Sequence, residues 1–75
     1  MYLIYIMFRS GKEGYYCRVA DDGTILYNSS EPDSRIDAEF NYYTAPNYGR
    51  ALSKAKWLCS TFKSVVGRTE IIKFN

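Results

Sequence analysis

The chain has 75 residues, 47% of them hydrophobic and 17% aromatic, and its formal net charge is +2. A chain of this length has room for one hydrophobic core, so residues 1–75 are expected to form a single domain. With no histidine and only two cysteines, the sequence cannot supply a Ser-His-Asp or Cys-His catalytic group, nor the four ligands of a structural zinc site.

The first 28 residues read as three short strands. Residues 2–9 are apolar on both alternating sets and rich in β-branched and aromatic types, which is typical of an interior strand. A turn over residues 10–14 precedes a second strand, Tyr15–Ala20, and a third strand follows at Thr24–Asn28. Between these two strands Asp21-Asp22-Gly23 predicts a tight hairpin, because glycine accepts the positive φ that such a turn needs. The three strands are therefore expected to form an antiparallel meander.

Residues 28–46 carry turn formers and acids, and they leave two alternatives open. A structureless loop of this length is uncommon in a compact domain. Either Phe40–Thr44 forms a further short edge strand, or the segment is a functional or mobile loop.

A helix is expected from about Tyr48 to Val65, with Asn47 or Thr44 as its N-cap and Gly67 just after its end. At 100° per residue the apolar side chains fall in one arc about 120° wide, which should face the core. They are Tyr48, Ala51, Leu52, Ala55, Leu58, Cys59, Phe62 and Val66. The last segment, Thr69–Phe74, has the composition of a strand.

The element order is therefore β-β-β-α-β, an α+β fold. Its mostly antiparallel four-stranded sheet should have the strand order 3-2-1-4, with one helix packed on one face. In this prediction the helix carries the chain back across the sheet, so the last strand lies parallel to the first.

No motif for catalysis or for a cofactor is present. The sequence has no glycine-rich phosphate-binding loop, and the spacing of Asp33, Asp37 and Glu39 fits no calcium loop. We expect no enzyme activity, no cofactor and no metal. Cys17 and Cys59 are interpreted as buried free thiols in a reducing compartment, the cytoplasm. The apolar run at residues 2–8 is too short to span a membrane.

Charge is distributed unevenly along the chain. Residues 21–39 carry one cation against six acids, a balance of −5, whereas residues 40–69 carry five cations and no acid, a balance of +5. An acidic segment thus precedes a basic one.

The outer side of the predicted helix is the first candidate partner-binding surface. Trp57 lies on the wheel opposite the apolar arc and is surrounded by cations, a composition found in interface hot spots. The candidate residues are Arg50, Lys54, Lys56, Trp57, Thr61 and Lys63. The alternative is that the acidic segment at residues 21–39, with its Tyr42-Tyr43 continuation, folds over this side and buries Trp57 within the domain.

The uncovered face of the sheet is the second candidate surface, because one helix covers only one side. The residues expected there, for a partner or for a homodimer, are Tyr5, Met7, Tyr16, Arg18 and Tyr27. The alternative is that the long loop, or the opposite register of side chains on the second and third strands, covers this face.

Together these features favour a tyrosine-rich protein-binding module, acting as an adaptor or as a stoichiometric inhibitor of a macromolecular partner. Small inhibitors from bacteriophages and mobile elements are often built this way, which is an analogy of size and composition alone. The alternative is a small nucleic-acid-binding module that uses the basic side of the helix, although ten cations balanced by eight acids are few for such a domain.

Overall fold

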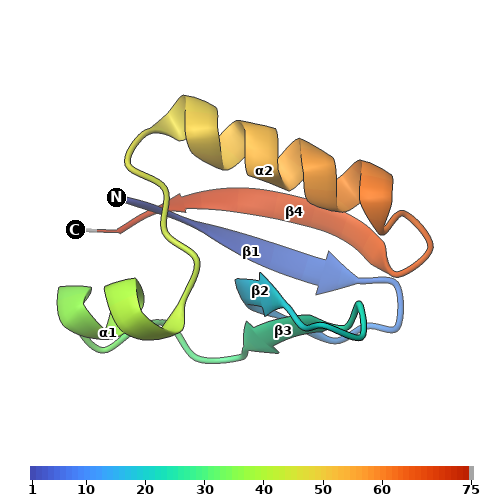
Figure 1. Cartoon of the computed structure of the whole chain (residues 1–75), viewed down its shortest axis with the longest axis horizontal. Helices are drawn as coiled ribbons and strands as arrows, with labels where there is room; N and C mark the ends of the chain where they lie inside the picture. Colours follow the sequence, from blue (N-terminus) through green and yellow to red (C-terminus); the bar gives the residue numbers. More distant parts are fainter. Residues whose placement is uncertain (75) are drawn as a thin grey trace.

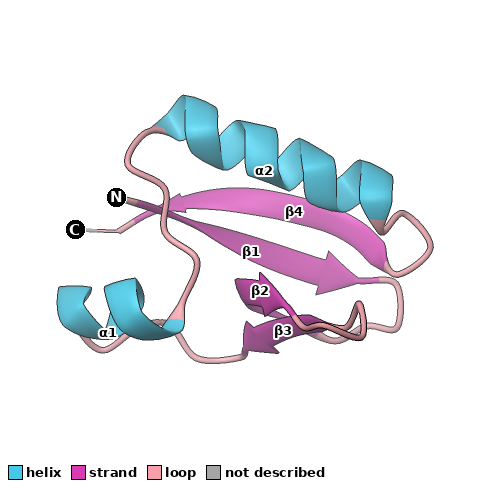
Figure 2. Cartoon of the chain, in the orientation of Figure 1, coloured by secondary structure: helices cyan, strands magenta, loops and turns pink. Residues whose placement is uncertain are grey.

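A computed structural model describes residues 1–74 of the chain. Four strands form one sheet in the order β3-β2-β1-β4, with α2 along one side and α1 set apart from it (Figures 1 and 2). The elements are β1 (Tyr2–Phe8), β2 (Glu13–Val19), β3 (Ile25–Asn28), α1 (Arg35–Asn41), α2 (Tyr48–Thr61) and β4 (Val66–Lys73). Within residues 1–74, no helix is both long and apolar enough to cross a membrane.

The α+β fold and the strand order 3-2-1-4 confirm the predictions from the sequence. The β2–β3 hairpin forms at the predicted turn, where Gly23 has a φ of 88° and its N–H donates to the Ala20 carbonyl at 2.9 Å. The Asp22 carboxylate accepts the Thr24 N–H at 2.9 Å, the local bond for which Asp is favoured in turns.

The direction of β4 was predicted wrongly. It pairs with β1 in antiparallel fashion, from Tyr2 opposite Lys73 to Phe8 opposite Val66. The reason is that residues 29–47, and not the long helix, carry the chain back across the domain. The helix α2 then starts beside Tyr2, whose ring lies 5.9 Å from that of Tyr48, and runs in the direction of β1. The chain leaving α2 must therefore return against β1.

The segment that the sequence left open contains a short helix, α1, and not an edge strand. The Ser34 hydroxyl accepts the Asp37 N–H at 3.1 Å, and the Asp37 carboxylate accepts the Asp33 N–H at 2.9 Å. This reciprocal arrangement resembles a capping box and satisfies backbone donors at the start of the helix. The hydrogen bonds to Asp37, from Asp33 and then from Asn41, lower the pKa of its carboxyl group.

The core lies between α2 and the face of the sheet that we call the inner face. Ile4 and Ile6 of β1 are fully buried there, together with Leu58 of α2 and Val66 of β4. The core side of α2 is formed by Ala51, Ala55 and Leu58, so most of the predicted arc faces inward. Tyr48 is the exception, because it is 54% exposed at the start of the helix.

Tyr16 and Tyr27 were expected on the opposite, outer face, and the structure places both on the inner face. The register sets Ile6 opposite Gly14, so Tyr16, two residues further on, points to the core and is only 4% exposed. Tyr27 is the cross-strand partner of Tyr16, and its ring lies 4.8 Å from that of Phe8. A bulge between Tyr16 and Arg18 then returns β2 to the pattern in which Val19 faces the core.

Gly14 is needed for the close approach of β3 to β2. A Cβ atom at this position would lie 2.5 Å from Cδ2 of Tyr27 and 2.7 Å from the Asn28 carbonyl oxygen. We expect Gly14→Ala to lower the free energy of unfolding by about 1–3 kcal/mol, because the strand must shift to admit the methyl group.

Urea denaturation followed by circular dichroism measures this loss. Gly49→Ala is the matched control, since the nearest atom to its new Cβ is Oδ1 of Asn47 at 3.5 Å. In the helix this change should be neutral or should stabilise by up to about 1 kcal/mol. Equal unfolding midpoints for the two variants would contradict the tight fit at Gly14.

Candidate partner-binding groove

One side of α2 borders a part of the inner face that the helix does not cover. The core contacts of α2 are with β1 and β4, while β2 and β3 lie further from it. Tyr43, from the segment before α2, occupies this space with its ring 5.5 Å from that of Tyr16. A hollow of about 560 Å³ remains between Tyr43 and the helix.

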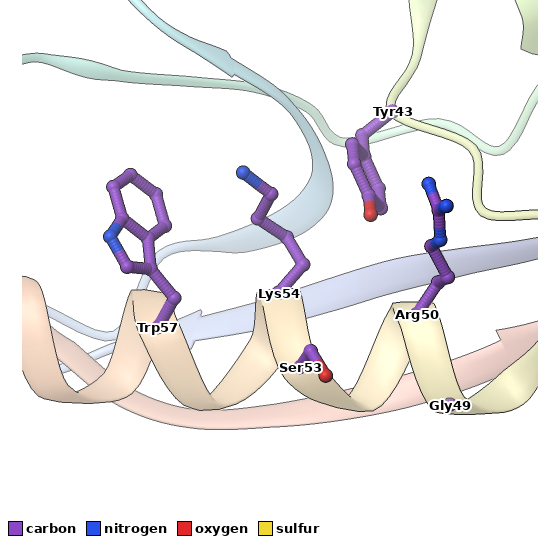
Figure 3. Close-up of a pocket in the computed structure, with 6 residues that line it drawn as sticks. All are labelled: Tyr43, Gly49, Arg50, Ser53, Lys54 and Trp57. Carbon is purple, nitrogen blue, oxygen red and sulfur yellow. The ribbon is translucent and has the colours of Figure 1, made fainter.

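The hollow is formed mainly by side chains from one side of α2. Arg50, Lys54 and Trp57 follow at intervals of four and three residues, which places them above one another on the same side of a helix. In Figure 3 these side chains stand in a row on the helix, and the ring of Tyr43 points toward the helix from the other side, between Lys54 and Arg50. We call this site the groove, and its lining residues are Tyr43, Gly49, Arg50, Ser53, Lys54 and Trp57.

The start of α2 is fixed by Asn47, whose side chain accepts the Arg50 N–H at 2.9 Å. Asn47 has an extended backbone, with φ −145° and ψ 166°, as an N-cap residue should. This cap was one of the two candidates from the sequence. It sets which residues of α2 face the core, and so it also sets which residues face the groove.

Lys54 lies between the two aromatic rings of the groove. Its Nζ atom is 4.5 Å from the centre of the Trp57 ring and 5.7 Å from that of Tyr43, both within the range of cation–π attraction. The one ion pair found within residues 1–74 joins Arg68 and Glu70, away from the groove. The cations of Arg50 and Lys54 therefore face the groove without a carboxylate partner in the described chain.

Trp57 is 41% exposed and is not covered by the acidic segment. Its ring packs edge-on against Phe62 at 5.6 Å between ring centres. The alternative in which residues 21–39 bury Trp57 is thus not the arrangement found. The buried residues of α2 are Ala51, Ala55 and Leu58, so the core face of the helix is rotated from the predicted arc. As a result Trp57 lies at the side of the helix and not directly opposite the core.

A second hollow, of about 470 Å³, lies at the end of α2. Its apolar lining comes from Phe8, Ile25, Phe62 and Val65, and Val65 is 46% exposed. Phe62 lines this hollow and also touches Trp57, so the cationic groove and the apolar hollow adjoin. Together they offer positive charge at one end and apolar surface at the other.

Three of the predicted helix residues lie outside the groove. Lys56 is exposed but sits about 100° around the helix from Trp57, and Thr61 is exposed in the last turn. Lys63 lies beyond the helix, where its carbonyl oxygen accepts a hydrogen bond of 2.7 Å from the Arg9 Nε–H. Tyr43 was named only in the alternative in which the acidic segment and its Tyr42-Tyr43 continuation fold over this side of the helix, and the structure does place Tyr43 there, although Trp57 stays exposed.

The outer face of the sheet carries Tyr5, Met7 and Arg18, as expected. The Tyr5 hydroxyl donates to the Glu13 carboxylate at 2.9 Å, and this hydrogen bond raises the pKa of Tyr5. The outer face is therefore not wholly apolar, because the Tyr5 hydroxyl and the Glu13 carboxylate lie on it.

The loop does cover part of this face, as the alternative reading held. The ring of Tyr42, directly after α1, lies 6.3 Å from that of Tyr15, and Leu3 is only 1% exposed. A homodimer through the remaining outer face stays a prediction.

The two cysteines are free and partly buried. Burial raises the pKa of the Cys17 thiol, which disfavours the reactive thiolate. The Cys59 sulfur lies 3.6 Å from the Thr69 hydroxyl. No group of three or more His, Cys, Asp or Glu side chains placed to hold a metal is found among residues 1–74.

Comparison of the chain with protein-family models, with curated proteins and with solved structures finds no match. The groove is consequently interpreted from its own geometry and charge.

The charge around Trp57 can be measured with ionic quenchers. Because Lys54 and Arg50 face the groove unpaired, iodide should quench the emission of this single tryptophan more strongly than caesium does. Lys54→Glu leaves one cation and one carboxylate in the groove, so it should lower the ratio of the iodide to the caesium Stern–Volmer constant.

Lys73→Glu is the control, because it changes the net charge equally at the far end of β4. At about 0.1 M salt, screening over about 10 Å should isolate Trp57 from that position. If both variants shifted the quenching alike, the charge at Trp57 would belong to the whole protein and not to the groove.

Proposed function

We propose that this chain is a non-enzymatic binding module that engages an acidic protein surface through the groove, and so acts as an adaptor or as a stoichiometric inhibitor that masks its partner. The observation that carries the proposal is the exposed Trp57 in a hollow with two unpaired cations. Tryptophan and arginine dominate the energetics of protein interfaces, above all where a concave site excludes water around them. The free thiols of Cys17 and Cys59 support a place in the cytoplasm.

A protein partner is favoured over nucleic acid by the apolar hollow next to the groove. Phe8, Ile25, Phe62 and Val65 would meet apolar side chains there, whereas a nucleic-acid backbone would bring phosphates. The acidic segment at residues 21–39 would also repel a long polyanion. What supports nucleic acid is the pairing of Tyr43 and Trp57 with cations, since bases stack on such rings.

Titration of the Trp57 emission tests the proposal. The first probe is a short synthetic peptide rich in Glu and Phe, and the second is an oligothymidylate of about 12 nucleotides. We expect the peptide to shift and saturate the emission, and Lys54→Glu to weaken its binding at least about tenfold.

A version of the peptide with Lys in place of Glu is the matched ligand control and should not bind. Quenching by the oligothymidylate alone, with a steep dependence on salt, would replace the proposal with nucleic-acid binding. An emission that responds to neither probe would contradict a binding role for the groove.

A further inference from the structure

The short helix α1 exposes a pair of large apolar side chains. Ile36 is 67% exposed and Phe40 is 83% exposed, while Ala38 is fully buried. Ile36 and Phe40 are four residues apart, so they lie on one side of α1, opposite the side that Ala38 packs inward. In a chain of 75 residues, two such side chains in water are an unpartnered apolar ridge.

Acidic groups surround this ridge. Asp33, Asp37 and Glu39 lie within or next to α1, and Arg35, directly before Ile36, is the one cation there, so the acids outnumber it three to one. The Asp37 carboxylate accepts hydrogen bonds from the Asp33 N–H and the Asn41 side chain, which lower its pKa. The surface of α1 therefore combines an aromatic side chain, an aliphatic side chain and negative charge.

We infer that α1 of one copy docks into the groove of a second copy. The groove presents the complementary features, namely the cations of Arg50 and Lys54, the exposed ring of Trp57 and the adjoining apolar hollow. Residues 33–41, which include α1, carry three acids against one cation, a balance of −2, and the groove carries the two cations of Arg50 and Lys54, so the two surfaces have opposite charge.

Within one copy this contact cannot form, because α1 and the groove lie on opposite faces of the sheet. Tyr42 holds the end of α1 on the outer face, where its hydroxyl donates to the Ser30 carbonyl at 2.7 Å and its ring contacts Tyr15. The next residue, Tyr43, already lies on the inner face against Tyr16. The complementary surfaces can therefore meet only between copies.

Two different surfaces meet in such a contact, so the interface is heterologous. Each copy keeps one free α1 and one free groove after the first contact. The protein should therefore form head-to-tail assemblies, either chains or closed rings, whose size increases with concentration and decreases as salt is added. The inference rests on the proposed function in using the same groove, and it adds that self-association competes with the partner.

Sedimentation velocity over a series of protein concentrations tests this inference. For the wild type we expect the weight-average mass to rise past that of a dimer. Phe40→Ser removes the larger side chain of the ridge, Glu39→Lys cancels the negative charge of residues 33–41, and Trp57→Ser removes the aromatic ring of the groove. Each variant should stay monomeric at concentrations at least about tenfold above those where the wild type associates. All three positions are exposed, and circular dichroism verifies that the variants fold.

Mixing the disabled variants gives the sharpest result. Phe40→Ser keeps a working groove and Trp57→Ser keeps a working α1, so an equimolar mixture should form a one-to-one dimer and nothing larger. The double variant Tyr5→Ser, Met7→Ser on the outer face is the control and should associate like the wild type.

The possible failures are distinguishable. Loss of association in the control, with Phe40→Ser unaffected, would overturn the inference in favour of a dimer through the outer face. A monomeric wild type at every concentration would overturn it as well. In both cases the proposed function stands if the Glu- and Phe-rich peptide still binds at Trp57, and it fails separately if that peptide does not bind.

Discussion

The arrangement of this domain depends on residues 43–45, which lie between β1 and β2 where these two strands no longer pair with each other. Tyr2 and Ala45 exchange two backbone hydrogen bonds of 2.9 Å, and the Tyr43 N–H donates to the Tyr16 carbonyl at 3.1 Å. These bonds satisfy backbone groups of β1 and β2 that would otherwise be unpaired inside the domain. They also lead the chain from the outer face, at Tyr42, to the inner face, at Tyr43. The start of α2, the direction of β4 and the far wall of the groove all follow from this crossing.

The sequence was sufficient for the features that depend on local pattern. The hairpin at Gly23, the buried Ile4 and Ile6, and the Asn47 cap each depend on residues close together in the chain. Strand order followed from the simplest connection between such elements.

What the sequence could not predict depends on contacts between distant residues. The crossing at Ala45 has no motif of its own, and without it the direction of β4 could not be derived. The bulge beyond Tyr16 shifted the strand pattern by one residue, and so Tyr16 and Tyr27 changed faces. Half of the groove could be predicted, because Arg50, Lys54 and Trp57 share a helix. Tyr43 reaches them only through the fold.

Three large apolar side chains of this small domain are exposed and add little to the stability of its core. A chain of this size buries a modest share of its surface, so each large apolar side chain left in water forgoes stabilisation that the core needs. Ile36, Phe40 and Trp57 are nevertheless kept at the surface, the first two on the mainly acidic α1 and Trp57 beside the cations of the groove. Because they contribute little to the core, they can be replaced without loss of the fold. We propose that these side chains make their contacts with a partner or with a second copy, since α1 and the groove lie on opposite faces of the sheet and cannot meet within one copy.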